Sequence, residues 1–230
     1  MGQILEGTKS ALMLLLSFDR EIYGIVGLSL YVTLTASIIS SFVAVPLGIL
    51  LAVKDFPMKQ FVVRFVYTMM SLPPVIVGLV IFLLFSRSGP LGVLRIIYTP
   101  TAMIVAQICL VMPIIIGIVY NGTKEKGREI QEVAETLGAN KMQTLVLLIK
   151  ELRINIFAAI VTGYGRAISE VGAVMIVGGN IRGDTRVMTT AIAMLKSQGD
   201  YETAIAIGIV LLLLSFLINS ILYKLQQEES

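Results

Sequence analysis

The sequence contains no histidine and no tryptophan, and its single cysteine is Cys109. Histidine is the commonest general base and metal ligand, so its absence argues against acid–base catalysis and against a histidine-based metal site. One thiol excludes a disulfide framework and a thiolate metal site. Charged residues make up only 14% of the 230 residues, and the formal net charge is +3. A charge this small and scattered argues against a nucleic-acid-binding surface.

What the chain has instead is apolar sequence, with 56% hydrophobic residues and a mean hydropathy of +0.88. A soluble domain is usually about 45–50% apolar and about 25% charged, so we expect an all-α integral membrane protein. Crossing a bilayer takes a helix of about 20 mostly apolar residues. Five segments qualify: Ile22–Val53, Phe65–Phe85, Ile96–Tyr120, Ile154–Ile181 and Thr203–Tyr223.

Two features modify this pattern. Pro73-Pro74 interrupts the second segment, as a proline kink or as a broken helix lining a cavity. Ser10–Phe18 is too short to cross, so residues 1–21 are expected to form an interfacial or elbow helix, and not a cleaved signal. We therefore expect one transmembrane domain over 22–223, with a tail at 224–230.

The distribution of Lys and Arg in the loops predicts orientation. With five spans, ten of these residues fall on one side and seven on the other. The side with ten includes the long loop 121–153, which is therefore expected to be cytoplasmic, with the N-terminus outside.

The loop 121–153 contains an amphipathic pattern. Apolar residues recur at helical spacing between Ile130 and Leu137, with glutamates on the other face, and Gly138 follows where a helix C-cap is expected. A short helix of this kind, held between two spans, is suited to docking in a groove of another subunit. An ordinary surface helix is the alternative.

The residues Glu132-Val133-Ala134-x-x-x-Gly138 resemble the Glu-Ala-Ala-x-x-x-Gly signature of ABC importer permeases of the MetI-like family. The Leu-Pro pair that usually follows in the family is missing, because Lys150 and Glu151 occupy its place. In that family this loop forms the coupling helix in a cleft of the ATP-binding subunit. The resemblance implies an ATPase-coupling role for Glu129, Glu132, Val133, Ala134, Leu137 and Gly138.

A second block begins Arg166-Ala-Ile-Ser169-Glu170-Val-Gly172-Ala and resembles a segment of permeases for molybdate, tungstate and sulfate. Its continuation, Gly179–Ile192, is most similar to the tungstate-type branch. A charge at mid-membrane costs roughly 2.5–3.5 kcal/mol on insertion scales, so Arg166 and Glu170 should face the bundle interior or a water-filled path. Spaced four apart, they are expected to share a helix face. We interpret Arg166, Ser169, Glu170 and Gly172 as translocation-path or gate residues, or as an internal ion pair that fixes helix packing.

The outer end of the fourth segment contains Asn180, Arg182 and Arg186. This loop is expected to contact a binding protein, to attract an oxyanion, or simply to be solvated.

The resemblance implies a non-enzymatic subunit of the prokaryotic cytoplasmic (inner) membrane that passes an oxyanion by alternating access. Tungstate is the expected cargo, with molybdate and sulfate as alternatives. Expected partners are a second copy of the chain, two ATP-binding cassette subunits, an extracytoplasmic oxyanion-binding protein and membrane lipid. No cofactor is expected in this chain, because ATP and magnesium would bind the partner; the chain has no P-loop sequence.

Two other classes of protein are weighed against this interpretation. An ATP-independent channel or carrier usually shows inverted repeats or buried proton-relay residues, and neither is recognisable in the sequence. A membrane enzyme would need a nucleophile–base or metal constellation, which is also absent from the sequence.

Overall fold

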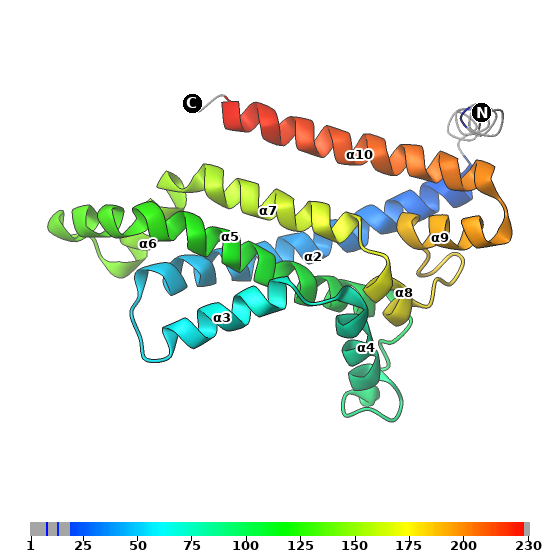
Figure 1. Ribbon diagram of the computed structural model, residues 1–230, viewed down its shortest axis with the longest axis horizontal. Helices are drawn as coiled ribbons and strands as arrows, with labels where there is room; N and C mark the ends of the chain where they lie inside the picture. The colour runs from blue at the N-terminus through cyan, green and yellow to red at the C-terminus, as the bar shows by residue number, and fades with distance from the viewer. Residues whose placement is uncertain (1–7, 9–12, 14–18, 228–230) are drawn as a thin grey trace. The chain divides into compact units, whose positions relative to one another are not determined.

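A computed structural model describes residues 8, 13 and 19–227 of the chain. Within these residues all regular secondary structure is helical (Figure 1), as the all-α prediction requires. The predicted interfacial helix at Ser10–Phe18 lies outside the described residues except for Met13. The helices are α2 (Arg20–Val53), α3 (Lys59–Met70), α4 (Pro74–Phe85), η1 (Gly92–Leu94), α5 (Pro100–Thr136), α6 (Lys141–Glu151), α7 (Arg153–Ile168), α8 (Gly172–Gly178), α9 (Met188–Gln198) and α10 (Tyr201–Gln227).

In the part of the chain that the structure describes, three stretches are long and apolar enough to cross a membrane: all of α2, all of α5, and Tyr201–Ile218 of α10. If α3 with α4 and α7 with α8 each make one interrupted span, the number rises to the expected five. The interruption at Pro73-Pro74 is confirmed. Pro73 is extended, with φ −61° and ψ 125°, because the ring of the following proline disfavours a helical conformation there.

The prediction that Arg166 and Glu170 share one helix face is wrong. Helix α7 ends at Ile168, and Glu170 lies in the break before α8. The Glu170 carboxylate accepts a hydrogen bond from the Ala173 backbone N–H at 3.1 Å. Such a local side-chain bond to the backbone offers the chain an alternative to helical hydrogen bonding.

The amphipathic segment from Ile130 to Leu137 is helical as predicted through Thr136, but the prediction that it forms a short helix of its own is wrong. Helix α5 is continuous for 37 residues, so the expected third span continues as helix through Thr136. Charged residues end an apolar run but not a helix, because Lys, Glu and Arg are good helix formers. Arg128 and Glu132, four residues apart, add an ion pair at 3.4 Å on the surface of this extension.

The described residues form two compact units, each assembled from three chain segments. The first unit comprises the described parts of Met1–Thr35, Pro73–Gln107 and Ile168–Ser220. The second comprises those of Ala36–Leu72, Ile108–Ala167 and Ile221–Ser230.

In the first unit, α4 packs directly on α8 (Figure 1). Small residues permit this approach, since a Cβ added at Gly78 would lie 2.6 Å from the Cα of Ala173. The segment just before α5 is connected to α8 by a hydrogen bond from the Tyr98 N–H to the Val177 carbonyl at 2.9 Å. Helix α9, which the apolar runs did not predict, joins this unit through a hydrogen bond from the Met188 N–H to the Ser29 hydroxyl at 2.8 Å.

In the second unit, parts of α2, α5, α6 and α7 surround a shared apolar core. Gly48 and Gly163 face α5 so closely that an added Cβ would lie 2.9 Å from a side chain of that helix. Close packing of small residues replaces the hydrophobic drive that lipid does not supply. The buried core residues are Ala44, Val45, Ile49, Val111, Ile115, Val119, Leu148, Leu152, Ile156, Ala159 and Ala167.

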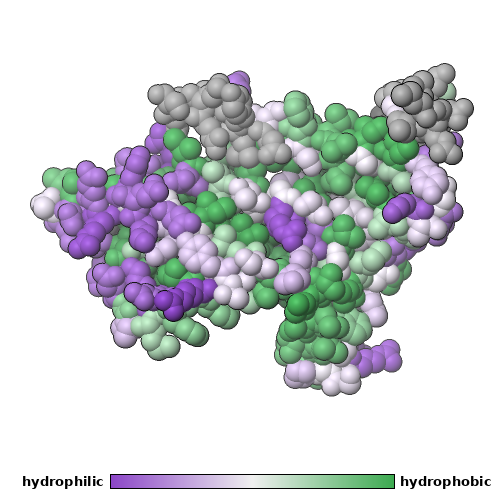
Figure 2. Space-filling model, in the orientation of Figure 1, coloured by the Kyte–Doolittle hydropathy of each residue, from purple (hydrophilic) through white to green (hydrophobic). Residues whose placement is uncertain are grey.

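The surface divides into apolar and charged regions (Figure 2). Apolar side chains cover α4, and polar ones gather over the end of α5 and over α6. The apolar surface of α4 is what lipid or another membrane subunit would cover. The exposed residues of α4 are Val75, Ile76, Leu79, Val80, Leu83 and Leu84.

Candidate functional site

The first candidate region is the turn at residues 137–140 between α5 and α6, which we call the α5–α6 corner. Gly138 has a φ of +77°, in the left-handed region that favours glycine. Its N–H donates to the Glu135 carbonyl at 3.0 Å, and the Ala139 N–H donates to the Ala134 carbonyl at 3.0 Å. This pair of bonds is a Schellman motif, which confirms the predicted C-cap.

Helix α6 begins immediately after this stop. The Asn140 side chain accepts from the Gln143 N–H at 2.9 Å, and the Gln143 side chain accepts from the Asn140 N–H at 2.8 Å. This reciprocal capping box was missed in the sequence, although its spacing of three residues is a recognisable signal. Hydrogen bonds at the corner therefore fix both the end of α5 and the beginning of α6.

The predicted coupling residues separate into exposed and buried members. Ala134 is 1% exposed and packs inward, whereas Val133 is 53% and Leu137 80% exposed. Glu129, Glu132 and Gly138 are also exposed. Helix α6 adds Met142, at 68% exposure, which the sequence argument did not identify. Exposed apolar side chains among charges, at a rigid corner, are suited to docking on another protein.

A hollow on α6 extends this surface. It has a volume of about 290 Å³ and an open shape on the face next to Met142. Its wall combines apolar residues with one glutamine and one lysine. The lining residues are Met142, Gln143, Val146, Leu147 and Lys150.

The second candidate region is the break between α7 and α8. Glu170 is only 5% exposed, and its backbone carbonyl accepts from the Thr189 hydroxyl at 2.8 Å. Together with the bond to Ala173, this places Glu170 in contact with both α8 and α9. Gly172 lies against the start of α4, because an added Cβ would be 2.8 Å from Val75 Cγ2.

The other two predicted gate residues precede Glu170 in the chain. Ser169 is exposed in the break, and Arg166 is half-buried in the last turn of α7. The interpretation of these four residues as translocation-path or gate residues, or as an internal ion pair, stays a prediction.

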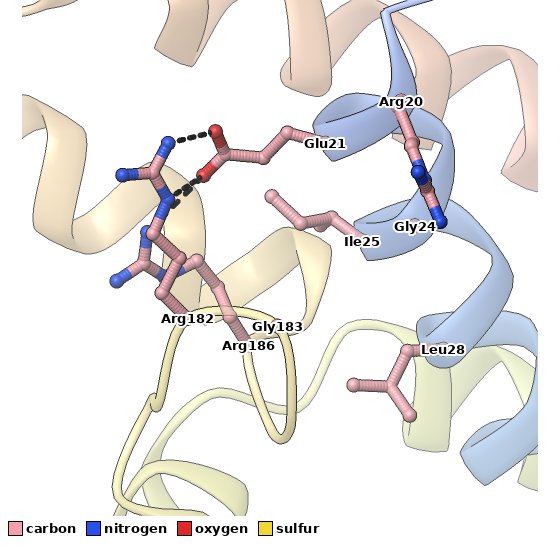
Figure 3. Close-up of a pocket in the computed structure, with 8 residues that line it drawn as sticks. All are labelled: Arg20, Glu21, Gly24, Ile25, Leu28, Arg182, Gly183 and Arg186. Carbon is pink, nitrogen blue, oxygen red and sulfur yellow. Dashed lines mark hydrogen bonds and ion pairs between the residues drawn. The ribbon is translucent and has the colours of Figure 1, made fainter.

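The third candidate region is the loop 179–187, where the structure brings the predicted arginines together. Arg182 donates to both carboxylate oxygens of Glu21 at the start of α2, with Nε to Oε1 at 2.8 Å (Figure 3). Arg186 Nη1 lies 3.7 Å from the same Oε1. The hydrogen bond to Glu21 raises the pKa of Arg182 above its ordinary value. No local signal identifies Glu21 as the partner, since 161 residues separate it from Arg182.

Thr185 gives this loop its shape. Its hydroxyl donates to the Gly178 carbonyl at 2.5 Å and accepts from the Ile181 N–H at 2.9 Å. Asn180, the third predicted residue, has a φ of +52° and offers its carbonyl to Arg186 Nη2 at 3.5 Å. Asn180, Arg182 and Arg186 therefore belong to one hydrogen-bonded loop, in which residues 181–184 are exposed.

A cavity of about 550 Å³ lies beside the Glu21 ion pairs. Figure 3 shows the side chains of Glu21 and Arg182 pointing toward one another, while the Arg20 side chain leaves the same turn of α2 in another direction. The cavity is lined by Arg20, Glu21, Gly24, Ile25, Leu28, Arg182, Gly183 and Arg186. Among the described residues, no group of three or more Cys, Asp or Glu is arranged to hold a metal ion.

Comparison with known proteins shows what this membrane fold belongs to. The family model described as binding-protein-dependent transport system inner membrane component matches residues 44–228. The tungstate uptake system permease protein TupB of Peptoclostridium acidaminophilum is 51% identical over 99% of this chain and 100% of its own length. TupB of Campylobacter jejuni is 33% identical over 99% of this chain and 95% of its own length.

A solved structure has the same fold. The MetNI methionine ABC transporter, in an inward-facing conformation, contains a chain that superposes with a TM-score of 0.72. The match covers 92% of this chain and 95% of that one, at 18% sequence identity. The expected MetI-like permease fold is therefore confirmed. With three to five spans and a family match over most of its length, the chain belongs to the inner membrane components of binding-protein-dependent transport systems, which work with a binding protein and an ATP-hydrolysing subunit.

Proposed function

We propose that this chain is the permease subunit of an ABC importer that takes up tungstate by ATP-driven alternating access. The observation behind the proposal is the 51% identity, over the full length of both chains, to a permease of a tungstate uptake system. Identity at this level over 99% of the chain includes the spans, the α5–α6 corner and the loop 179–187.

The proposed assembly contains two copies of this chain, two ATP-binding cassette subunits and an extracytoplasmic oxyanion-binding protein. ATP and magnesium bind the cassette subunits, and this chain holds no cofactor. The exposed apolar surface of α4 supports contact with a second permease or with lipid, because soluble surfaces rarely expose such a large apolar patch.

In this assembly the cassette subunit docks on the α5–α6 corner. Val133 and Leu137 supply exposed apolar surface beside the exposed carboxylate of Glu132. Gly138 permits the sharp end of α5, and Ala134 packs underneath. Glu170 and Gly172 hold α8 in place at the translocation path, while Arg166 and Ser169 lie at the adjacent helix end.

The cargo is tested by reconstituting the permease and cassette subunits in liposomes with the binding protein loaded with tungstate, molybdate or sulfate. We expect the tungstate-loaded protein to stimulate ATP hydrolysis most. Greater stimulation by molybdate or sulfate would assign the importer to that anion. Tungstate uptake by the permease alone, without cassette subunits or ATP, would instead establish a channel or carrier.

Docking is tested by co-purification of the cassette subunit with permease variants. Gly138→Val forces a β-branched residue into the left-handed region, which costs roughly 1–2 kcal/mol and deforms the corner. Gly199→Val is the matched control, because Gly199 has a φ of +83° and open space but ends α9. We expect only Gly138→Val to lose the cassette subunit, and Glu132→Lys to weaken its retention more than Glu151→Lys. Equal retention in all four variants would remove the corner as the docking site.

A further inference from the structure

The cavity beside Glu21 has the charge of an anion site. Its lining residues include three arginines and one glutamate, whose side chains carry a formal net charge of +2. Its volume of about 550 Å³ lies within the usual range of small-ligand sites. The guanidinium fork donates several parallel N–H bonds, and it is the side chain best suited to oxyanions.

Arg186 is the least satisfied group in this cavity. Its side chain is 15% exposed, yet its contacts with Glu21, at 3.7 Å, and with the Asn180 carbonyl, at 3.5 Å, are both long. Its Nε is buried and has no hydrogen-bond partner among the described residues. A buried guanidinium normally has partners for its donors, because an unpaired buried charge is costly. Arg186 therefore has donors available for an anion.

Glu21 occupies the place that such an anion would take. Its two oxygens accept from Arg182 and face Arg186, and its side chain is 41% exposed. A partly exposed ion pair of this kind contributes little stability, so another anion can replace the carboxylate.

We propose that this cavity binds a tetrahedral oxyanion, which displaces Glu21 from Arg182 and Arg186. The proposal rests on the proposed function for the placement of the cavity at the outer surface and for the class of anion. Glu21 then acts as an internal competitor that keeps the arginines paired when no anion is bound.

The neighbouring cavity limits the affinity of this site. It shares Arg182, Arg186 and Glu21 but is also lined by Asp19 and Asp200. Both aspartates accept hydrogen bonds at helix starts, Asp19 from the Ile22 N–H and Asp200 from the Thr203 N–H. Their negative charge confines an oxyanion to the Arg20 side and favours its release, as an importer requires.

The site is tested by equilibrium dialysis of the purified permease–cassette complex against tungstate, without binding protein or ATP, with tungsten measured by mass spectrometry. We expect saturable binding. Arg186→Gln should weaken it by more than about tenfold, because hydrogen bonds between charged groups are lost. Glu21→Gln should strengthen it by about two- to fivefold, the size of a surface ion pair. Arg87→Gln removes an exposed loop arginine and should change nothing.

Several results would overturn the proposal. These are no saturable binding by the wild-type complex, weaker binding in Glu21→Gln, or unchanged binding in Arg186→Gln. If Arg186→Gln does not assemble, unchanged binding in Arg182→Gln has the same meaning, since Arg182 is 72% exposed and tolerates substitution. If the arginine variants bind tungstate normally in dialysis while the binding protein no longer stimulates their ATP hydrolysis, this result would mean that the arginines contact that protein instead.

Failure of this site is distinguishable from failure of the proposed function. If the tungstate-loaded binding protein stimulates ATP hydrolysis while dialysis shows no site, only the inference fails. If dialysis shows a tungstate site while another anion drives the importer, only the tungstate assignment fails.

Discussion

The close packing of α4 on α8 makes a sharp prediction for Gly78→Ala. The added Cβ would lie 2.6 Å from Ala173 Cα, 3.1 Å from its carbonyl oxygen and 3.2 Å from its Cβ. Carbon atoms normally rest about 3.5–4.0 Å apart, so the shortfall is roughly 1 Å. The added Cβ would clash with backbone atoms of α8, so rotating a side chain cannot relieve the clash. Overpacking of this kind costs about 1–3 kcal/mol.

A matched variant separates packing from helix propensity. Gly208→Ala lies within α10 of the same unit, where the added Cβ meets nothing within 4 Å. Both substitutions gain the usual helix preference of alanine over glycine, about 0.5–1 kcal/mol, so their difference isolates the packing cost.

The assay is thermal unfolding of the purified permease in detergent, followed by loss of helical circular dichroism. One kcal/mol shifts the midpoint by about 2–4 °C for a soluble domain of comparable length, so Gly78→Ala should unfold about 2–12 °C below Gly208→Ala. Equal midpoints, or a higher midpoint for Gly78→Ala, would refute the close approach of α4 to α8.

Three further variants test other contacts by the same measurement. Gly163→Ala should lower the midpoint less than Gly78→Ala, because its added Cβ meets side-chain atoms, 2.9 Å away, that can rotate; an equal loss would contradict this. Thr185→Val should cost about 1–3 kcal/mol by leaving the Gly178 carbonyl unsatisfied, and Thr185→Ser, which keeps the hydroxyl, should recover most of it. Asn140→Ala should cost about 0.5–2 kcal/mol and speed amide exchange in the first turn of α6, whereas Asn140→Ser should not; equal exchange in both would count against the cap.

Local features of this fold were predictable from sequence. The break at Pro73-Pro74 and the C-cap at Gly138 follow from the backbone restrictions of proline and the freedom of glycine. Apolar runs identified the membrane-crossing segments, because lipid selects for length and hydropathy alone.

Helix boundaries and long-range pairs were not predictable in the same way. Hydropathy marks where a segment leaves the apolar phase, whereas α5 continues through charged residues to Thr136. The break after Ile168 lies in sequence that is mostly apolar, and it depends on contacts of Glu170 with α8 and α9. For the candidate anion site, the sequence predicted Arg182 and Arg186 but not Glu21, whose role depends entirely on folding.

The α5–α6 corner has a mechanical consequence. A left-handed glycine ends one helix and a reciprocal cap begins the next within residues 138–140, so the turn has little freedom to bend. If the cassette subunit docks there, its movement is transmitted to the ends of both α5 and α6, because the turn between them hardly bends. An extra glycine inserted next to Ala139, between Gly138 and Asn140, would make the turn more flexible. The cassette subunit would still hydrolyse ATP, but fewer ions would cross for each ATP consumed.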